Sequence, residues 1–206
     1  MKKAMVFIDY ENFEIARQCL YERTNVPRLD IPALPMKIVE RIGGNLELIK
    51  TFLFIPKPDE TLMRQEWRKK RYDFLKGLEN VNNFTVVTGS HRARPKNGRF
   101  EDIDIENKNT YYVVEKGTDI NVTAHLLTKA FHGSYDTAIV VSGDTDYIPV
   151  YDLVNTIGRE IIVVGLEGQN MARFKAHTDK QVILDKAFLD DCISTYHSAA
   201  KTDAPS

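Results

Sequence analysis

Residues 139–146 read Ile-Val-Val-Ser-Gly-Asp-Thr-Asp, a sequence typical of the end of a buried β-strand. An apolar, strand-like segment stops at Ser-Gly and then presents two carboxylates, Asp144 and Asp146. A second apolar run, residues 4–8, passes directly into Asp9. If the two runs are neighbouring strands of one sheet, their acidic ends meet, and converging carboxylates favour a divalent cation.

Apolar runs alternate with helical patterns along the rest of the chain, which predicts an α/β domain with a parallel sheet flanked by helices on both faces. The predicted strands are residues 4–8, 47–55, 84–88, 137–142, 160–165 and 181–184. The predicted helices are residues 12–24, 35–43, 59–79, 119–132, 146–157 and 169–176. We expect one domain over residues 1–190 and a C-terminal extension over 191–206, with frayed ends from about Ser198.

Residues 88–109 fit neither periodicity. They combine a basic stretch with an acidic one, and we expect a long loop or a small hairpin inserted into the domain. Loops of this length are unusual in compact domains unless they are functional or disordered.

Composition limits the class of protein. The chain has 206 residues, of which 43% are hydrophobic, enough to bury one sizeable core. Cys19 and Cys192 fit neither a disulfide framework nor a zinc pattern, which favours a reducing compartment. Asp9 interrupts the N-terminal apolar run too early for a signal peptide or a membrane span. We therefore expect a soluble cytoplasmic protein that does not associate with a membrane.

The net charge of -1 conceals an asymmetry along the chain. Residues 57–99 hold 11 Lys and Arg against five Asp and Glu, so the remainder is acidic. A basic middle suits a phosphate-rich polymer, although a solvated helix face explains part of it equally well.

Asp119 adds a third acid, because it begins an apolar pattern at helical spacing. Taken singly, each candidate has a structural explanation: Asn12 as a helix cap, and Asp119 as a favourable charge at a helix N-terminus. Gathered in one crevice, however, carboxylates repel by about 4 kcal/mol per pair at about 4 Å and an effective dielectric of about 20. Such a cluster calls for a cation, and oxygen ligands suit Mg²⁺ or Mn²⁺.

Competing chemistries lack their motifs. There is no Walker loop and no Gly-x-Gly-x-x-Gly after the first strand. Ser142 is not in a Gly-x-Ser-x-Gly context, and the five histidines lack zinc spacing. A phosphatase with Asp9 as nucleophile stays open, although Glu11 stands where such enzymes usually have a second Asp.

Four blocks resemble the NYN domain family, especially its LabA-like branch: residues 7–12, 116–120, 135–147 and 158–165, in family order. The resemblance implies a PIN-like fold and metal-dependent ribonuclease activity. It also implies an active site lined by Asp9, Asn12, Asp119, Asp144 and Asp146. Asp179 is loosely similar to a late Asp found in many family members.

We therefore expect a Mg²⁺- or Mn²⁺-dependent ribonuclease, with RNA as partner. Its metal ligands would be Asp9, Asp119, Asp144 and Asp146, with Asn12 steadying the site. The residues expected to contact RNA phosphates are Lys116, Arg92, Arg94, Lys96 and Arg99. Trp67 or Tyr72 could stack on bases, but the preferred interpretation of these two rings is packing on their own helix. Two alternatives remain, a non-catalytic RNA-binding adaptor and the phosphatase, and a homo-oligomer is left open.

Overall fold

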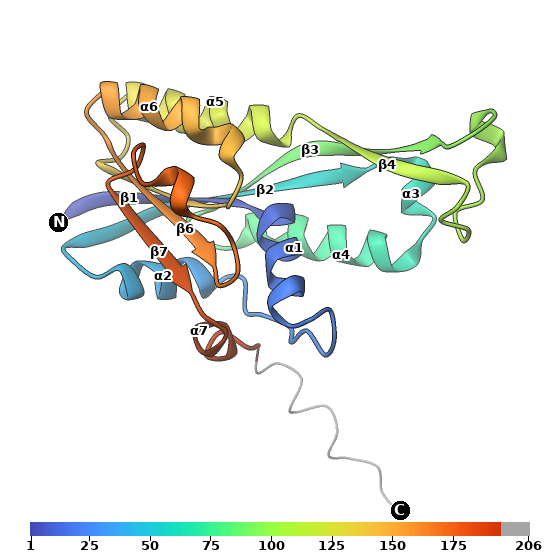
Figure 1. The fold of residues 1–206 in the computed structure, drawn as a ribbon, viewed down its shortest axis with the longest axis horizontal. Helices are drawn as coiled ribbons and strands as arrows, with labels where there is room; N and C mark the ends of the chain where they lie inside the picture. The colour runs from blue at the N-terminus through green and yellow to red at the C-terminus, as the bar shows by residue number, and fades with distance from the viewer. Residues whose placement is uncertain (195–206) are drawn as a thin grey trace, which may run out of the picture.

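Seven strands form one sheet in the order β4-β3-β2-β1-β5-β6-β7 in the computed structural model, which describes residues 1–194 (Figure 1). Every neighbouring pair is parallel except β3 and β4, which run antiparallel. The strands are β1 (Lys2–Asp9), β2 (Leu46–Pro58), β3 (Phe84–Pro95), β4 (Tyr111–Lys116), β5 (Thr137–Val141), β6 (Glu160–Leu166) and β7 (Lys180–Leu184). The predicted α/β fold, a PIN-like and mostly parallel sheet flanked by helices, is confirmed.

The strand order reverses between β1 and β5. From β1 the chain builds outward through β2, β3 and β4, and then returns to place β5, β6 and β7 on the other side. Ile8 lies opposite Val141 in the register, so the segments that follow these two residues emerge side by side. In open α/β sheets, such a switch point at the carboxyl ends of the strands is where ligands bind.

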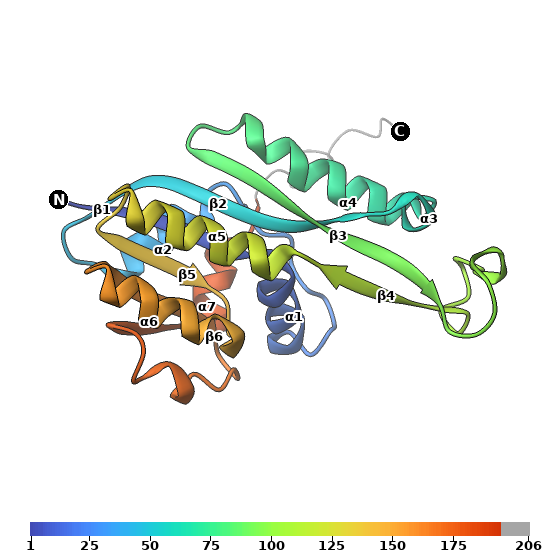
Figure 2. The ribbon, with the colours of Figure 1, turned by 90° about the horizontal axis from the view of Figure 1, so that it is seen from above.

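Side chains of β1 alternate between two hydrophobic cores, one on each face of the sheet. Val6 and Ile8 belong to one hydrophobic core, and Met5 and Phe7 to the other. Since successive side chains of a strand point to opposite faces, a fully apolar strand needs helices on both sides. Both views show α5 and α6 together on one face, and α1 and α2 on the other (Figures 1 and 2).

The helices are α1 (Tyr10–Leu20), α2 (Leu34–Ile42), α3 (Glu60–Met63), α4 (Glu66–Gly77), α5 (Thr118–Phe131), α6 (Ile148–Thr156) and α7 (Lys186–Asp190). None of the helices within residues 1–194 is long and apolar enough to cross a membrane.

Two predicted helices are wrong. The helix expected over 59–79 is broken into α3 and α4 at Gln65, whose backbone is extended (φ -78°, ψ 108°). The buried Gln65 amide donates to the Ile105 carbonyl at 2.8 Å, and this bond ties the break to the β3–β4 region. The helix expected over 169–176 is only a 3-10 turn at Ala172–Phe174, and the Asn170 side chain accepts from the Ala172 amide.

The region expected as a long loop or hairpin is a hairpin. β3 continues past residue 88 to Pro95, and β4, which the periodicity missed, pairs with it from Ser90 opposite Lys116 to Pro95 opposite Tyr111. A small third core, centred on Leu62, Ala93 and Tyr111, supports it. We call the outer parts of β2, β3 and β4, with the loop between β3 and β4, the arm; Figure 1 shows it projecting beyond the rest of the sheet. The frayed end expected from Ser198 lies outside the described residues.

Candidate active site

An acidic cavity of about 310 Å³ lies at the carboxyl ends of β1 and β5, at the strand-order switch point. Its lining is defined by Asp9, Glu11, Asn12, Ile15, Glu115, Thr118, Asp119, Asp144, Asp146 and Tyr147. Three separate segments supply it: the β1–α1 junction, the β4–α5 junction and the turn after β5. All five site residues expected from the sequence line this one cavity.

Asp9 is the buried centre of the cavity wall, with 7% of its surface exposed. Its Oδ2 accepts hydrogen bonds from the Tyr147 hydroxyl at 3.0 Å and the Ser142 hydroxyl at 3.3 Å. Its Oδ1 accepts from the Asn12 amide at 3.4 Å, so Asp9 also caps α1. Burial raises the pKa of Asp9 to about 6, although the hydrogen bonds from Tyr147 and Asn12 oppose the rise. The bonds fix the carboxylate in one orientation while burial makes its negative charge costly.

Asn12 holds the turn that carries Asp144. Its side-chain oxygen accepts from the Gly143 amide at 2.8 Å and from the Gln169 amide group at 3.4 Å. The other end of the Gln169 side chain accepts from the Leu166 amide at 2.8 Å. A Cβ at Gly143 would lie 2.4 Å from Gln169 Nε2, so a side chain here would displace the Gln169 amide group that contacts Asn12. Asn12 therefore positions the β5 turn and does not serve α1 as its cap, a role taken by Asp9.

The turn after β5 arranges its own two carboxylates. The Asp144 amide donates to Ser142 Oγ at 3.2 Å, and Asp144 Oδ1 accepts from the Asp146 amide at 2.9 Å. Asp144 thus caps a 3-10 turn, Thr145–Tyr147, which brings the Tyr147 hydroxyl onto Asp9. Asp146 is exposed, whereas Asp144 is half-buried.

The six carboxylates of the cavity fall into two groups by partner. Glu11 pairs with Arg71 at 3.3 Å, and Glu115 pairs with His91 at 3.6 Å, a contact that lowers the pKa of Glu115. Within residues 1–194, the four aspartates of the cavity form no salt bridge, and no Lys, Arg or His lines the cavity. Each glutamate thus has a side-chain partner in the protein, whereas the aspartates are left for a ligand of positive charge.

Comparison with known proteins identifies the family. The NYN domain profile matches residues 3–185, most of the chain. The chain belongs to the NYN domain family. NYN domains are PIN-like nucleases. No match was found among curated proteins.

A solved structure has the same fold as this NYN domain. It is a protein of unknown function from Vibrio parahaemolyticus RIMD 2210633, with a TM-score of 0.56 and 15% sequence identity. The alignment covers 91% of this chain and 96% of that chain. At this identity the likeness concerns the fold alone.

The donor set of the NYN cavity fits a hard divalent cation. All its candidate ligands are oxygens, and the buried Asp9 carboxylate has no positive partner in the described part of the chain. Among residues 1–194, no three His, Cys, Asp or Glu side chains already form a tight chelating group. Mg²⁺ keeps several waters and needs only one or two direct carboxylates, so a wide cavity with several aspartates suits it.

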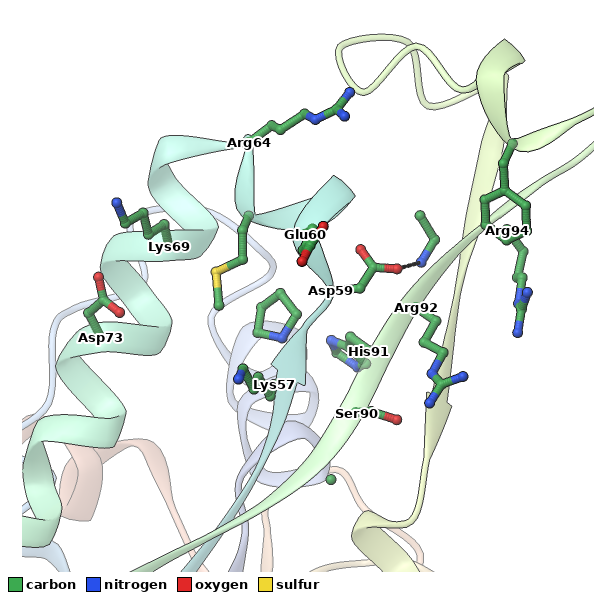
Figure 3. A pocket seen from close by; sticks show the side chains of 15 residues that line it. Lys57, Asp59, Glu60, Arg64, Lys69, Asp73, Ser90, His91, Arg92 and Arg94 are labelled. Atoms are coloured by element: carbon green, nitrogen blue, oxygen red, sulfur yellow. Dashed lines mark hydrogen bonds between the residues drawn. The ribbon is translucent and has the colours of Figure 1, made fainter.

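The residues expected to bind RNA are not gathered at one place. Arg92 and Arg94 line a second, larger cavity of about 850 Å³ on the arm (Figure 3). Lys96 and Arg99 lie farther out, where Lys96 donates to the Lys108 carbonyl at 3.1 Å and the Arg99 amide to Asp102 at 2.6 Å. Lys116 ends β4 beside Ser90 and lines neither of these two cavities.

Asp179 does not join the acidic cavity of the NYN domain. It precedes β7, at the opposite end of the sheet, and its Oδ2 accepts from the Ile161 amide at 2.8 Å. The role implied by its loose similarity to a late family Asp is therefore wrong for this chain, and the residue joins β6 to the start of β7.

Sequence reasoning missed three residues of the NYN site: Tyr147, Gln169 and Glu115. Tyr147 stands three residues after Asp144, a spacing that could have indicated a turn folding back onto Asp9. Gln169 had no signal, because its contact with Asn12 joins segments 157 residues apart. Glu115 stands in a strand that the periodicity did not reveal.

Proposed function

We propose that this NYN domain is a metal-dependent ribonuclease that hydrolyses RNA phosphodiester bonds in the acidic cavity, with Mg²⁺ or Mn²⁺. One observation carries the proposal: four aspartates without salt bridges in the described chain line one cavity at the strand-order switch point of a PIN-like nuclease fold. We also infer the LabA-like branch from the four sequence blocks, and a cytoplasmic location from the composition.

Each residue has a separate role in the proposal. Asp9, Asp119 and Asp144 would hold the metal directly, while Asp146, which is exposed, would ligate it or orient its water. Asn12 keeps Asp144 in place through Gly143. A bound Mg²⁺ or Mn²⁺ supplies a water nucleophile at neutral pH and stabilises charge on the phosphoryl group.

The hydroxyls beside Asp9 orient that carboxylate and do not act as nucleophiles. Ser142 is buried, donates to Asp9 and accepts from the Asp144 amide, so its oxygen is occupied. Burial and the neighbouring Asp9 charge raise the pKa of Tyr147, which keeps its proton on the hydroxyl that donates to Asp9. The phenol thus stabilises the ionised form of Asp9, the form that binds a cation.

RNA is the proposed substrate because the family is one of nucleases and the arm carries cations that form no salt bridge within residues 1–194. Arg92, Arg94, Lys96, Arg99 and Lys116 remain the proposed phosphate contacts from the sequence. Their positions divide them into a cavity group, Arg92 and Arg94, and an outer group. The outer group would serve RNA farther from the cleaved bond.

The test is incubation of purified wild-type protein with end-labelled RNA in Mn²⁺ and in EDTA. We expect cleavage in Mn²⁺ only, and its loss in Asp144→Asn. Glu40→Gln, an exposed neutralisation on α2, serves as the matched control and should cut normally. Cleavage that survives in Asp144→Asn sinks the metal-site assignment. Binding without cleavage in wild type favours the adaptor, and turnover of a chromogenic phosphomonoester with no action on RNA favours the phosphatase.

A further inference from the structure

The large cavity on the arm, which we call the basic cavity, is lined from two sides. α3, α4 and the end of β2 form one wall, and residues 89–94 of β3 form the other (Figure 3). Its volume of about 850 Å³ is well above that of the acidic cavity. Five cationic side chains line it: Lys57, Arg64, Lys69, Arg92 and Arg94.

The positive charge of the basic cavity is not neutralised from within. In the described part of the chain, none of the five cations forms a salt bridge. Of the acids in the lining, Asp59 accepts from the Leu62 amide at 2.9 Å and from the Ala93 amide at 2.8 Å, so both its oxygens are engaged in holding α3 to β3. With Glu60 and Asp73, Asp59 makes three acids against five cations, so the lining keeps an excess of positive charge. A concave surface with this imbalance attracts a polyanion.

Exposed aromatic rings accompany the cations. Phe100 lines the basic cavity with 52% of its surface exposed, and the Arg94 guanidinium lies 5.4 Å from the centre of its ring. Trp67 is also 52% exposed, with Arg68 at 4.5 Å from its ring. Rings left open beside phosphate-binding cations are the arrangement on which unpaired bases stack.

The basic cavity lies close to the acidic cavity, and a small hollow between them shares wall residues with both. Pro58 and His91 line both the basic cavity and a small hollow that contains Trp67. Glu11 lines both that hollow and the acidic cavity. His91 also pairs with Glu115 of the acidic cavity at 3.6 Å. An RNA strand bound in the basic cavity would therefore lie near the aspartates of the acidic cavity.

We propose that the basic cavity binds a single-stranded segment of RNA next to the bond cut in the acidic cavity. The inference rests on the proposed function for the identity of the polymer. Lys57, Lys69 and Arg92 contact phosphates, and Phe100 stacks on a base. Paired RNA does not fit this role, because its bases are stacked inside the helix and cannot reach the rings.

The test measures binding in EDTA, where metal-dependent cleavage does not occur. The probes are a fluorescein-labelled oligouridylate and a blunt RNA duplex of the same length, followed by anisotropy over a series of salt concentrations. Lys69→Glu/Arg92→Glu reverses one charge on each wall. Arg173→Glu/Lys175→Glu makes the same change of net charge on exposed residues outside the basic cavity.

We expect wild type to bind oligouridylate more tightly than the duplex. The cavity double variant should bind oligouridylate at least about tenfold more weakly, with the salt slope reduced by about 1.4 for two lost contacts. The control pair should stay within about threefold, since distant exposed charges are screened at physiological salt. Phe100→Ala should weaken binding by about fivefold or more without changing the slope.

The double variant Lys69→Gln/Arg92→Gln removes the two charges without reversing them, so it perturbs folding less than the glutamate pair. It should lower the salt slope of oligouridylate binding by the same amount. Equal losses in the cavity and control pairs, or tighter binding of the duplex, would overturn the proposal. So would a wild type that does not bind oligouridylate. If binding follows the prediction but RNA is never cut in Mn²⁺, the proposed ribonuclease fails while the single-strand site stands.

Discussion

The acidic and basic cavities are neighbours of opposite charge, and they hold their charged groups in different ways. In the acidic cavity, Asp9 and Asp144 are fixed by hydroxyls and backbone amides at the ends of strands. In the basic cavity, the exposed Lys57, Lys69 and Arg92 project from the arm and α4 without salt bridges in the described chain. Carboxylates held in one orientation can position a reacting group accurately, whereas long, exposed cationic side chains can follow the phosphates of a flexible polymer.

The largest effect that we expect is on RNA cleavage in the acidic cavity, with little change in RNA binding by the basic cavity. Asp119→Asn should lower kcat/KM for RNA in Mn²⁺ by at least about 100-fold, because the loss of a direct ligand exceeds the 10- to 100-fold cost of an outer-shell change. Its oligouridylate Kd in EDTA should stay within about twofold, since Asp119 lies outside the basic cavity. Parallel cleavage and anisotropy assays check this. An equal loss of binding and cleavage would mean that the two cavities act as one site.

The second prediction concerns how much the buried negative charge of Asp9 lowers the stability of the folded protein. The pKa of Asp9 is about 6 in the folded protein, whereas its ordinary value, taken for the unfolded chain, is 3.8. Between about pH 4 and pH 6 the native state therefore holds more protons than the unfolded state. Stability therefore falls as pH rises through this window, by up to about 3 kcal/mol at 1.36 kcal/mol per unit. Without metal, Asp9→Asn should be more stable than wild type at about pH 8, and the difference should vanish below about pH 4.

Urea unfolding of both proteins at the two pH values measures this difference, and Glu40→Gln is the control. A variant that is less stable than wild type at high pH would show that burial does not penalise the carboxylate. Added Mn²⁺ should raise the free energy of unfolding of wild type and leave that of Asp9→Asn unchanged, because a ligand that binds the native state stabilises it.

The third prediction tests the wall between the cavities. Gly89 of β3 lines the basic cavity, and a Cβ there would lie 2.3 Å from Thr118 Oγ1 at the start of α5. Gly89→Ala must push α5 and Asp119 outward, at about 2 kcal/mol of stability. Gly77→Ala is the matched control: it meets no atom within 4 Å at φ -60° and should add about 0.4 to 1 kcal/mol. Thermal unfolding compares them, and equal stabilities would contradict the close approach of β3 to α5.

The smallest effect concerns the Glu11–Arg71 pair at the border of the cavities. Arg71 also lies over the Tyr10 ring at 5.3 Å, and both partners of the pair are half-buried. Arg71→Met should lower stability by about 0.5 to 1 kcal/mol. Lys70→Met, which breaks the exposed pair with Glu66, should cost less. A larger loss from Lys70→Met in urea unfolding would show that the border pair is not structural.

The sequence predicts the acidic cavity better than the basic one. Asp9 and Asp144 follow apolar runs, and parallel strands end at the same edge of a sheet, so their meeting follows from local pattern. The basic cavity needs β3 to run on to Pro95 and the 59–79 helix to break at Gln65, and both depend on tertiary contacts with the arm. Mixed basic and acidic residues conceal the strand period there. The excess of basic residues in the middle of the sequence pointed to Arg92 and Arg94, but only the folded structure places them in one cavity with Lys57 and Lys69.

The most direct test of the central claim is a crystal of the protein soaked in Mn²⁺ and measured for anomalous scattering. We expect a peak in the acidic cavity between Asp9, Asp119 and Asp144, and none at that place in Asp144→Asn. A soaked wild-type crystal without a peak there, or with the same peak in Asp144→Asn, would contradict it.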